Sequence, residues 1–114
     1  MIESDALTLA EAAQGFAAVG SEPRMEVLLC LVRAGADGLV FGDIQKRTGI
    51  PASTLNHHLR FLAAAELITQ TRIGRQTVSR PDYRRLEALS SFLLARCCAD
   101  VPGGVHTHEK DCVS

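Results

Sequence analysis

The sequence contains no tryptophan and one tyrosine, and aromatic residues make up only 4% of it. Proteins that bind single-stranded nucleic acid stack bases on aromatic side chains, so this scarcity argues against that class. No apolar run approaches the ~20 residues that a membrane span requires. Residues 1–5 include no basic residue, although a secretory signal would begin with one. We therefore predict a cytoplasmic protein without a membrane partner.

The chain also lacks an excess of charge of either sign, because 12 Lys and Arg residues oppose 13 Asp and Glu residues. This balance alone would exclude a uniformly cationic nucleic-acid binder. The charges are segregated, however. Eight basic and three acidic residues lie between Asp43 and Arg85, a net +5, while four basic and ten acidic residues elsewhere give −6. Local charge governs which partner a surface attracts, so the middle of the chain remains a candidate DNA-binding region.

With 114 residues, of which 46% are hydrophobic, the chain suits a single folded domain. Apolar periodicity predicts five helices: one beginning at Leu9, one over Arg24–Ala34, a short one from Phe41 to Gly49, one from Pro51 to Ala65, and one from Tyr83 to Cys98. Ser21 is a candidate N-cap for the second, which is apolar nearly all round and therefore predicted to be buried. The third and fourth, joined by a tight turn, form a helix-turn-helix.

The helix after Pro51 has two distinct faces. We predict that the stripe of Leu55, His58, Leu59 and Leu62 packs inward. We predict that the opposite face contacts DNA through Ser53, Thr54, Asn56, His57 and Arg60. A recognition helix needs small hydrogen-bonding groups near its N-terminus, because these meet base edges in the major groove. A polar face alone is also typical of a merely solvated helix, and the neighbouring elements favour recognition.

Two β-prone segments follow, Leu67–Arg72 and Arg75–Arg80, with Ile73-Gly74 between them. We predict a β-hairpin with Gly74 at its tip. Arg72 and Arg75 flank this tip, where they can reach a phosphate or the minor groove. The hairpin therefore adds a second DNA-binding element beside the helix-turn-helix.

The order of elements resembles the ArsR/SmtB family of metal-responsive winged-helix repressors. The likeness rests on Gly20-Ser21-Glu22-Pro23-Arg24, on Ser53-Thr54-Leu55-Asn56-His57-His58-Leu59-Arg60-Phe61-Leu62, on Glu66-Leu67-Ile68 and on Arg72-Ile73-Gly74-Arg75. The resemblance implies a mainly α fold with a small β-hairpin wing, forming a homodimer through its first and last helices. It also implies that the dimer binds double-stranded operator DNA and that an effector releases it. We expect an arm over 1–8, a domain over 9–99 and a flexible tail over 100–114.

Effector sites in this family vary in position. Many arsenic sensors carry Cys-x-Cys-Asp at the start of the third helix, where this chain has Val40-Phe41-Gly42-Asp43. The zinc-sensor pattern on the last helix is also absent from Asp82-Tyr83-Arg84. Some arsenic-responsive members instead place a Cys-Cys pair at the end of the last helix with a third Cys beyond it. The resemblance therefore implies Cys97, Cys98 and Cys112 as ligands of trivalent arsenic or antimony.

Soft, thiophilic ions select thiolate ligands, which suits this set. A trivalent organoarsenical with two open valences would need only Cys97 and Cys98. With cysteines, His106 and His108 of the tail can make a tetrahedral Zn or Cd site instead. Cys30, between two leucines, is predicted to be a small core residue.

Three other functions compete with a soft-metal sensor. The thiols can act as an oxidation switch on the same repressor. The helix-turn-helix can serve dimerisation alone. An enzyme such as a thiol-dependent arsenate reductase is disfavoured, because the sequence has neither Cys-x-x-Cys nor a Gly-rich phosphate loop.

Overall fold

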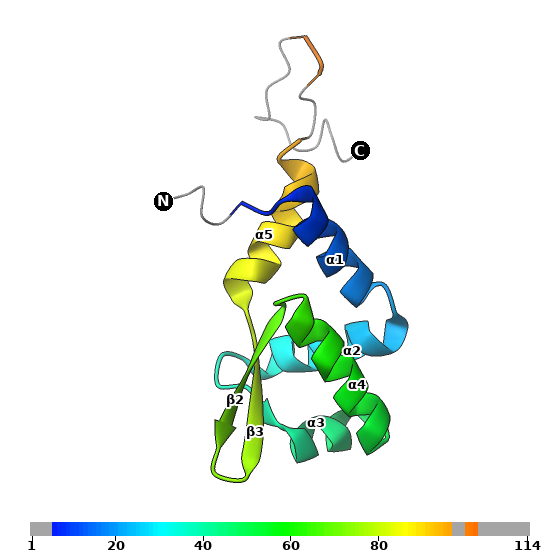
Figure 1. The fold of residues 1–114 in the computed structure, drawn as a ribbon, viewed down its shortest axis with the longest axis vertical. Coiled ribbons are helices and arrows are strands. Elements are labelled where there is room, and N and C mark those ends of the chain that lie inside the picture. The colour runs from blue at the N-terminus through cyan, green and yellow to red at the C-terminus, as the bar shows by residue number, and fades with distance from the viewer. Residues whose placement is uncertain (1–5, 97–99, 103–114) are drawn as a thin grey trace.

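The computed structural model describes residues 6–96 and 100–102 and contains five helices and three strands within them (Figure 1). In chain order these are α1 Leu9–Val19, α2 Glu22–Ala34, β1 Leu39–Val40, α3 Phe41–Thr48, α4 Ala52–Ala64, β2 Ile68–Ile73, β3 Gln76–Pro81 and α5 Tyr83–Leu94. The predicted fold class, mainly α with a β-hairpin wing, is confirmed. None of the helices in this part is long and apolar enough to span a membrane.

Side-chain caps define where the helices begin. The Ser21 hydroxyl accepts a hydrogen bond from the Arg24 backbone N–H, as predicted, and Pro23 lies in the first turn of α2. At α1, Thr8 and Glu11 form a reciprocal capping box that the sequence analysis missed. Gly49 ends α3 in the left-handed conformation, which allows the sharp turn into α4. The helix-turn-helix is therefore bounded as predicted.

The buried core lies between α2 and the elements around it. Its fully buried side chains include Val27, Leu31, Ile44, Leu55, Leu59, Leu62 and Leu67. Each buried leucine contributes about 1.5–3 kcal/mol relative to an exposed one, so this cluster holds α3 and α4 onto α2. Cys30 is buried in the same cluster, as predicted. Burial, the largest cause, raises the pKa of its thiol.

The wing is a three-stranded antiparallel sheet rather than a hairpin alone. Its strand order is β1-β3-β2, and Leu39 of β1 pairs with Ser79 of β3. Strand β1 was not predicted from the sequence. The hairpin is also shifted by one residue from the prediction, because Ile73 pairs with Gln76 and the loop is Gly74-Arg75. Arg75 therefore lies in the loop itself.

The elements divide between two ends of the molecule (Figure 1). We call α1 and α5 the body, and α3, α4 and the three strands the head; α2 contacts parts of both. Within the body the two helices approach closely at Gly15, where an added Cβ would lie 3.0 Å from the Leu89 methyl carbons. Helix α5 ends at Leu94, although the prediction extended it to Cys98. The prediction was longer because apolar residues recur at helical spacing in the sequence beyond Leu94.

Candidate nucleic-acid interface

Helix α4 presents the two faces that the sequence predicts. Leu55, His58, Leu59 and Leu62 are buried against the core. Ser53, Thr54, Asn56, His57 and Arg60 are all exposed. The polar groups near the start of this helix are therefore free to meet a partner, as recognition in a DNA groove requires.

A hollow of about 350 Å³ lies between α4, the start of α3 and the wing. It brings together Asn56 and Arg60 of α4 with Arg75 of the hairpin loop, three residues that the sequence analysis had named. Two arginines and no carboxylate line it, so it attracts anions. Arginine and asparagine are also the side chains that read guanine and adenine edges in the major groove.

The remaining predicted residues lie outside the lining of this hollow. Ser53 and Thr54 are exposed near the start of α4, and Arg72 donates from Nε to the carbonyl oxygen of Gly74 at 3.4 Å. That hydrogen bond directs Arg72 along the hairpin. The ring of His57 packs edge-on against Phe61, with ring centroids 5.1 Å apart. His57 therefore lies toward the side of α4 where α2 begins.

Arg24 connects three helices on that side. Its guanidinium lies 4.5 Å from the centroid of the Phe61 ring on α4. Its Nε donates to the carbonyl oxygen of Ala18 at 2.7 Å, and its Nη2 donates to that of Ala17 at 3.2 Å. A cation at the C-terminal carbonyls of α1 also complements the helix dipole. Arg24 thus attaches the ends of α1 and α4 to the start of α2.

His58 is buried as predicted, but it is not satisfied as a core histidine should be. It is 8% exposed, and its Nδ1 has no hydrogen-bond partner among the described residues. Burial, followed by the charges of Arg24 and His57, lowers the pKa of this imidazole. The inner face of the recognition helix therefore favours a neutral histidine.

Several residues of the hollow were missed by the sequence analysis. Gln70 and Gln76 of the wing strands line it, together with Thr77 and Ser79. The Gln70 side chain donates from Nε2 to the Ser79 hydroxyl at 3.1 Å, which fixes this wall of the hollow. The spacing along the strand could have indicated Gln70, because residues two apart share a face and Gln70 lies two residues before Arg72.

The proposed thiol ligands Cys97 and Cys98 lie outside the described residues, as do Cys112, His106 and His108. Within the described ranges no cluster of three or more His, Cys, Asp or Glu side chains can hold a metal ion. The chain approaches the cysteine pair through Arg96, whose guanidinium stacks 3.9 Å from the Phe92 ring centroid and donates to the Phe92 carbonyl oxygen at 3.0 Å.

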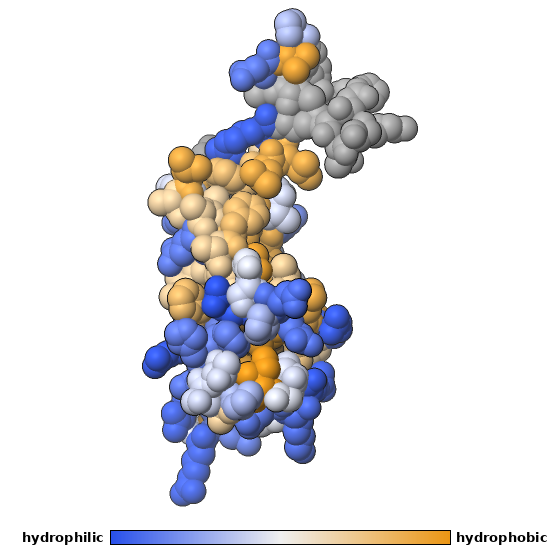
Figure 2. All heavy atoms as spheres, turned by 90° about the vertical axis from the view of Figure 1, so that its right-hand side faces the viewer, coloured by the Kyte–Doolittle hydropathy of each residue, from blue (hydrophilic) through white to orange (hydrophobic). Residues whose placement is uncertain are grey.

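The body exposes several large apolar side chains. Its larger exposed side chains are Leu9, Phe16, Leu93 and Leu94, which are 76%, 37%, 64% and 57% exposed. Figure 2 shows apolar side chains gathered on the end of the molecule that carries α1, whereas hydrophilic ones gather over the opposite end. Large apolar side chains exposed on two helices that contact each other suit an interaction surface.

Two of three comparisons with known proteins found matches, and both are consistent with this geometry. A family model for a helix-turn-helix domain matches residues 19–71. The structure is similar to an ArsR-like transcriptional regulator from Rhodococcus sp. RHA1, with 28% identity, a TM-score of 0.66, and coverage of 75% of this chain and 78% of that one. It is also similar to the crystal structure of an ArsR family transcriptional regulator, with 19% identity, a TM-score of 0.67, and coverage of 80% and 91%. No protein of curated function matches the chain.

Proposed function

We propose that this ArsR-like winged helix-turn-helix protein is a DNA-binding transcriptional repressor that a soft metal ion releases from its operator. The helix-turn-helix match and the similarity to two regulators support the coarser part of this proposal, a DNA-binding regulator rather than an enzyme. The effector and the dimer are proposals of their own. We assign its action to the cytoplasm, where thiols stay reduced.

The single observation that carries the proposal is the hollow shared by α4 and the wing. Asn56 and Arg60 come from the recognition helix and Arg75 from the hairpin loop, yet they line one space. In our proposal, α4 enters the major groove, Asn56 and Arg60 read base edges, and Arg75 and Arg72 bind phosphate or the adjacent minor groove. Phosphate contacts set the position and base contacts set the specificity.

Binding-site selection tests this proposal directly. Wild-type protein is incubated with a random duplex library, and Asn56→Ala is compared with Arg72→Ala on the selected sequence. Loss of a base contact changes which sequences are bound, whereas loss of a phosphate contact weakens all sequences alike and reduces the salt dependence. The proposal fails if wild type selects no sequence, or if Asn56→Ala retains both the affinity and the preference of wild type.

A homodimer would cover the exposed apolar side chains of the body. Leu9 and Phe16 on α1 and Leu93 and Leu94 on α5 would be covered by the same face of a second copy, which matches the isologous interfaces of two-fold dimers. A two-fold dimer would place two recognition helices about one DNA turn apart, ~34 Å. A small rotation at the body would then misalign one of them.

The proposed effector is trivalent arsenic or antimony, inorganic or methylated, bound by Cys97, Cys98 and Cys112. Three thiolates suit these soft ions. The support is the adjacency of the cysteine pair to the end of α5, since a ligand pulling on that segment acts on the body. A coupling of about 1–3 kcal/mol would weaken operator binding by roughly 5–150-fold.

A second candidate signal uses the same residues differently. His106 and His108 with the cysteines would make a Zn or Cd site, and oxidation of the thiols would make a redox switch. One titration separates these: operator release is measured against arsenite, antimonite, a trivalent methylarsenical, zinc, cadmium and peroxide. Cys97→Ser should retain operator binding and lose release by arsenite, while Cys30→Ser, the buried control, should respond as wild type does. Normal release from Cys97→Ser would contradict the thiol site.

A further inference from the structure

The end of α4 contains a residue that its backbone conformation disfavours. Glu66 has φ +64°, in the left-handed region where glycine is preferred. The Glu66 N–H donates to the carbonyl oxygen of Ala63 at 2.9 Å, and the Leu67 N–H donates to that of Leu62 at 3.0 Å. These are the two hydrogen bonds of a Schellman helix end. Glycine would make the same turn with less strain, so the Glu66 side chain needs another explanation.

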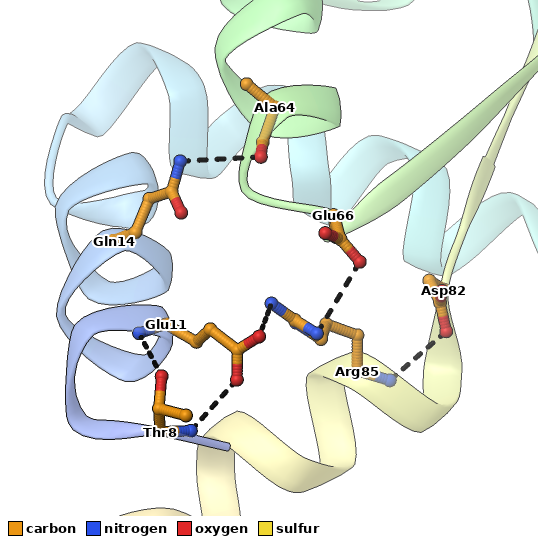
Figure 3. Close-up of polar contacts among 7 residues, drawn as sticks. All are labelled: Thr8, Glu11, Gln14, Ala64, Glu66, Asp82 and Arg85. Atoms are coloured by element: carbon orange, nitrogen blue, oxygen red, sulfur yellow. Dashed lines mark hydrogen bonds and ion pairs between the residues drawn. The ribbon is translucent and has the colours of Figure 1, made fainter. Parts of the chain in front are cut away.

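The Glu66 carboxylate is held by the body. Arg85, in the first turn of α5, places Nη1 3.5 Å from Glu66 Oε1 and Nη2 3.9 Å from Oε2 of Glu11 on α1 (Figure 3). The Arg85 side chain is only 18% exposed, so it is fixed between the two carboxylates. Glu11 is itself held, since the Thr8 N–H donates to its Oε1 at 2.9 Å. One guanidinium thus joins α1, α5 and the end of α4.

A second connection reaches the same place independently. The Gln14 side chain of α1 donates from Nε2 to the carbonyl oxygen of Ala64, the last residue of α4, at 3.4 Å (Figure 3). The last carbonyls of a helix have no partner within the helix, so this side chain satisfies one of them from outside. Two body helices therefore fix the C-terminal end of the recognition helix.

Stability does not explain these contacts. Glu66 is largely exposed, so solvent screens its ion pair with Arg85 and the pair adds little to folding, while the left-handed conformation opposes its side chain. Strained residues cluster at functional sites, so this outlier supports a hypothesis of function. Here the contacts join the end of α4 to both helices of the body.

We propose that Glu66, Arg85 and Gln14 form a clamp that sets the orientation of α4 relative to α1 and α5, and with it the separation of the two recognition helices in the dimer. This inference rests on the proposed function, a dimer that binds two operator half-sites. All three are positioning residues, since they act on DNA through α4. The clamp makes the protein selective for half-site spacing, independently of which bases each half-site contains.

The decisive variant is Glu66→Gly, because strain and positioning predict opposite effects. Operators are selected with wild-type protein, and the space between half-sites is then lengthened or shortened by one base pair. For each variant we compare the affinity for the selected operator with that for the altered ones. We expect Glu66→Gly to melt at or above the wild-type temperature, yet to lose roughly two- to five-fold of the spacing discrimination, as expected for an exposed pair.

Three further variants define the cause. Glu66→Gln, which retains the strained backbone and removes the charge, and Gln14→Ala should both lose discrimination, whereas Arg85→Lys should retain part of it. Glu26→Gln, which removes an exposed charge from α2, is the control and should match wild type. Unchanged discrimination in Glu66→Gly and Gln14→Ala would overturn the clamp, as would a lower melting temperature in Glu66→Gly. Wild type that selects no DNA would instead overturn the proposed function.

Discussion

The head and the body of this protein expose different groups around one continuous core. The head presents Asn56, Arg60 and Arg75 around a hollow without carboxylates. The body presents Leu9, Phe16 and Leu93 to solvent, and the half-buried Arg85 of the clamp lies between two carboxylates. Exposed polar groups on a rigid scaffold suit reversible binding, whereas exposed leucines suit a long-lived interface. The difference indicates two interfaces with separate tasks.

The largest effect should come from the base of the wing, at Gly38. It has φ +76°, and an added Cβ would lie 2.4 Å from the Ser79 carbonyl oxygen of β3. Gly38→Ala should therefore destabilise the protein by about 3 kcal/mol or more, combining a left-handed alanine with a backbone clash. Gly42→Ala, where nothing lies within 4 Å, is the matched control. Equal midpoints for the two variants in urea denaturation would contradict this account.

The next effect should separate the body from the head. Leu93→Asp places a charge among the exposed apolar side chains of α5, so we expect the proposed dimer to weaken by about 2–3 kcal/mol while each chain keeps its fold. Sedimentation equilibrium measures the association and circular dichroism measures the fold. Ala36→Asp adds the same charge to an exposed turn and should leave association unchanged. If Leu93→Asp associates as strongly as wild type, this part of α5 does not lie in the interface.

A third change tests the head while leaving the body intact. Arg60→Ala should cost about 1–3 kcal/mol of affinity for the selected operator, concentrated at one base position. Arg33→Ala, an exposed arginine at the end of α2, removes an equal charge and controls for loss of general attraction. Fluorescence anisotropy at two salt concentrations measures both. If the two variants bind alike, Arg60 makes no specific contact.

The smallest effect should be a pH dependence specific to the head. Burial, Arg24 and His57 lower the pKa of His58 below its ordinary 6.5, so the folded state favours the neutral ring. This contribution to stability is complete above pH 6.5 and is lost as the pH falls from there toward the folded-state pKa. His58→Leu should flatten the decline of unfolding free energy over that range. If the free energy of unfolding of His58→Leu falls with pH as steeply as that of wild type, other groups cause the decline.

Much of the fold was predictable because its signals are local. The Ser21 cap, the Gly49 stop and the two faces of α4 each follow from a few neighbouring residues. Strand β1 was missed because two residues have no periodicity of their own, and Leu39 becomes a strand only by pairing with Ser79. The Thr8–Glu11 capping box was visible as a Thr-x-x-Glu pattern and was overlooked.

The candidate site was less predictable than the fold. Exposure of Asn56 and Arg60 followed from the period of α4, but their proximity to Arg75 depends on tertiary packing. The clamp was invisible for the same reason, since Gln14 and Ala64 are 50 residues apart.

The short strand β1 has a mechanical consequence. It ends at Val40 and α3 begins at Phe41, so the wing and the helix-turn-helix share continuous backbone. The gap between Arg75 and Arg60 is then set by sheet register and helix packing, which deform little. If the spacing between these two arginines is fixed, the DNA duplex must deform to contact both. We therefore expect operators to be enriched in easily deformed pyrimidine–purine steps between the contacted bases. The deformability of the DNA would then contribute to sequence specificity.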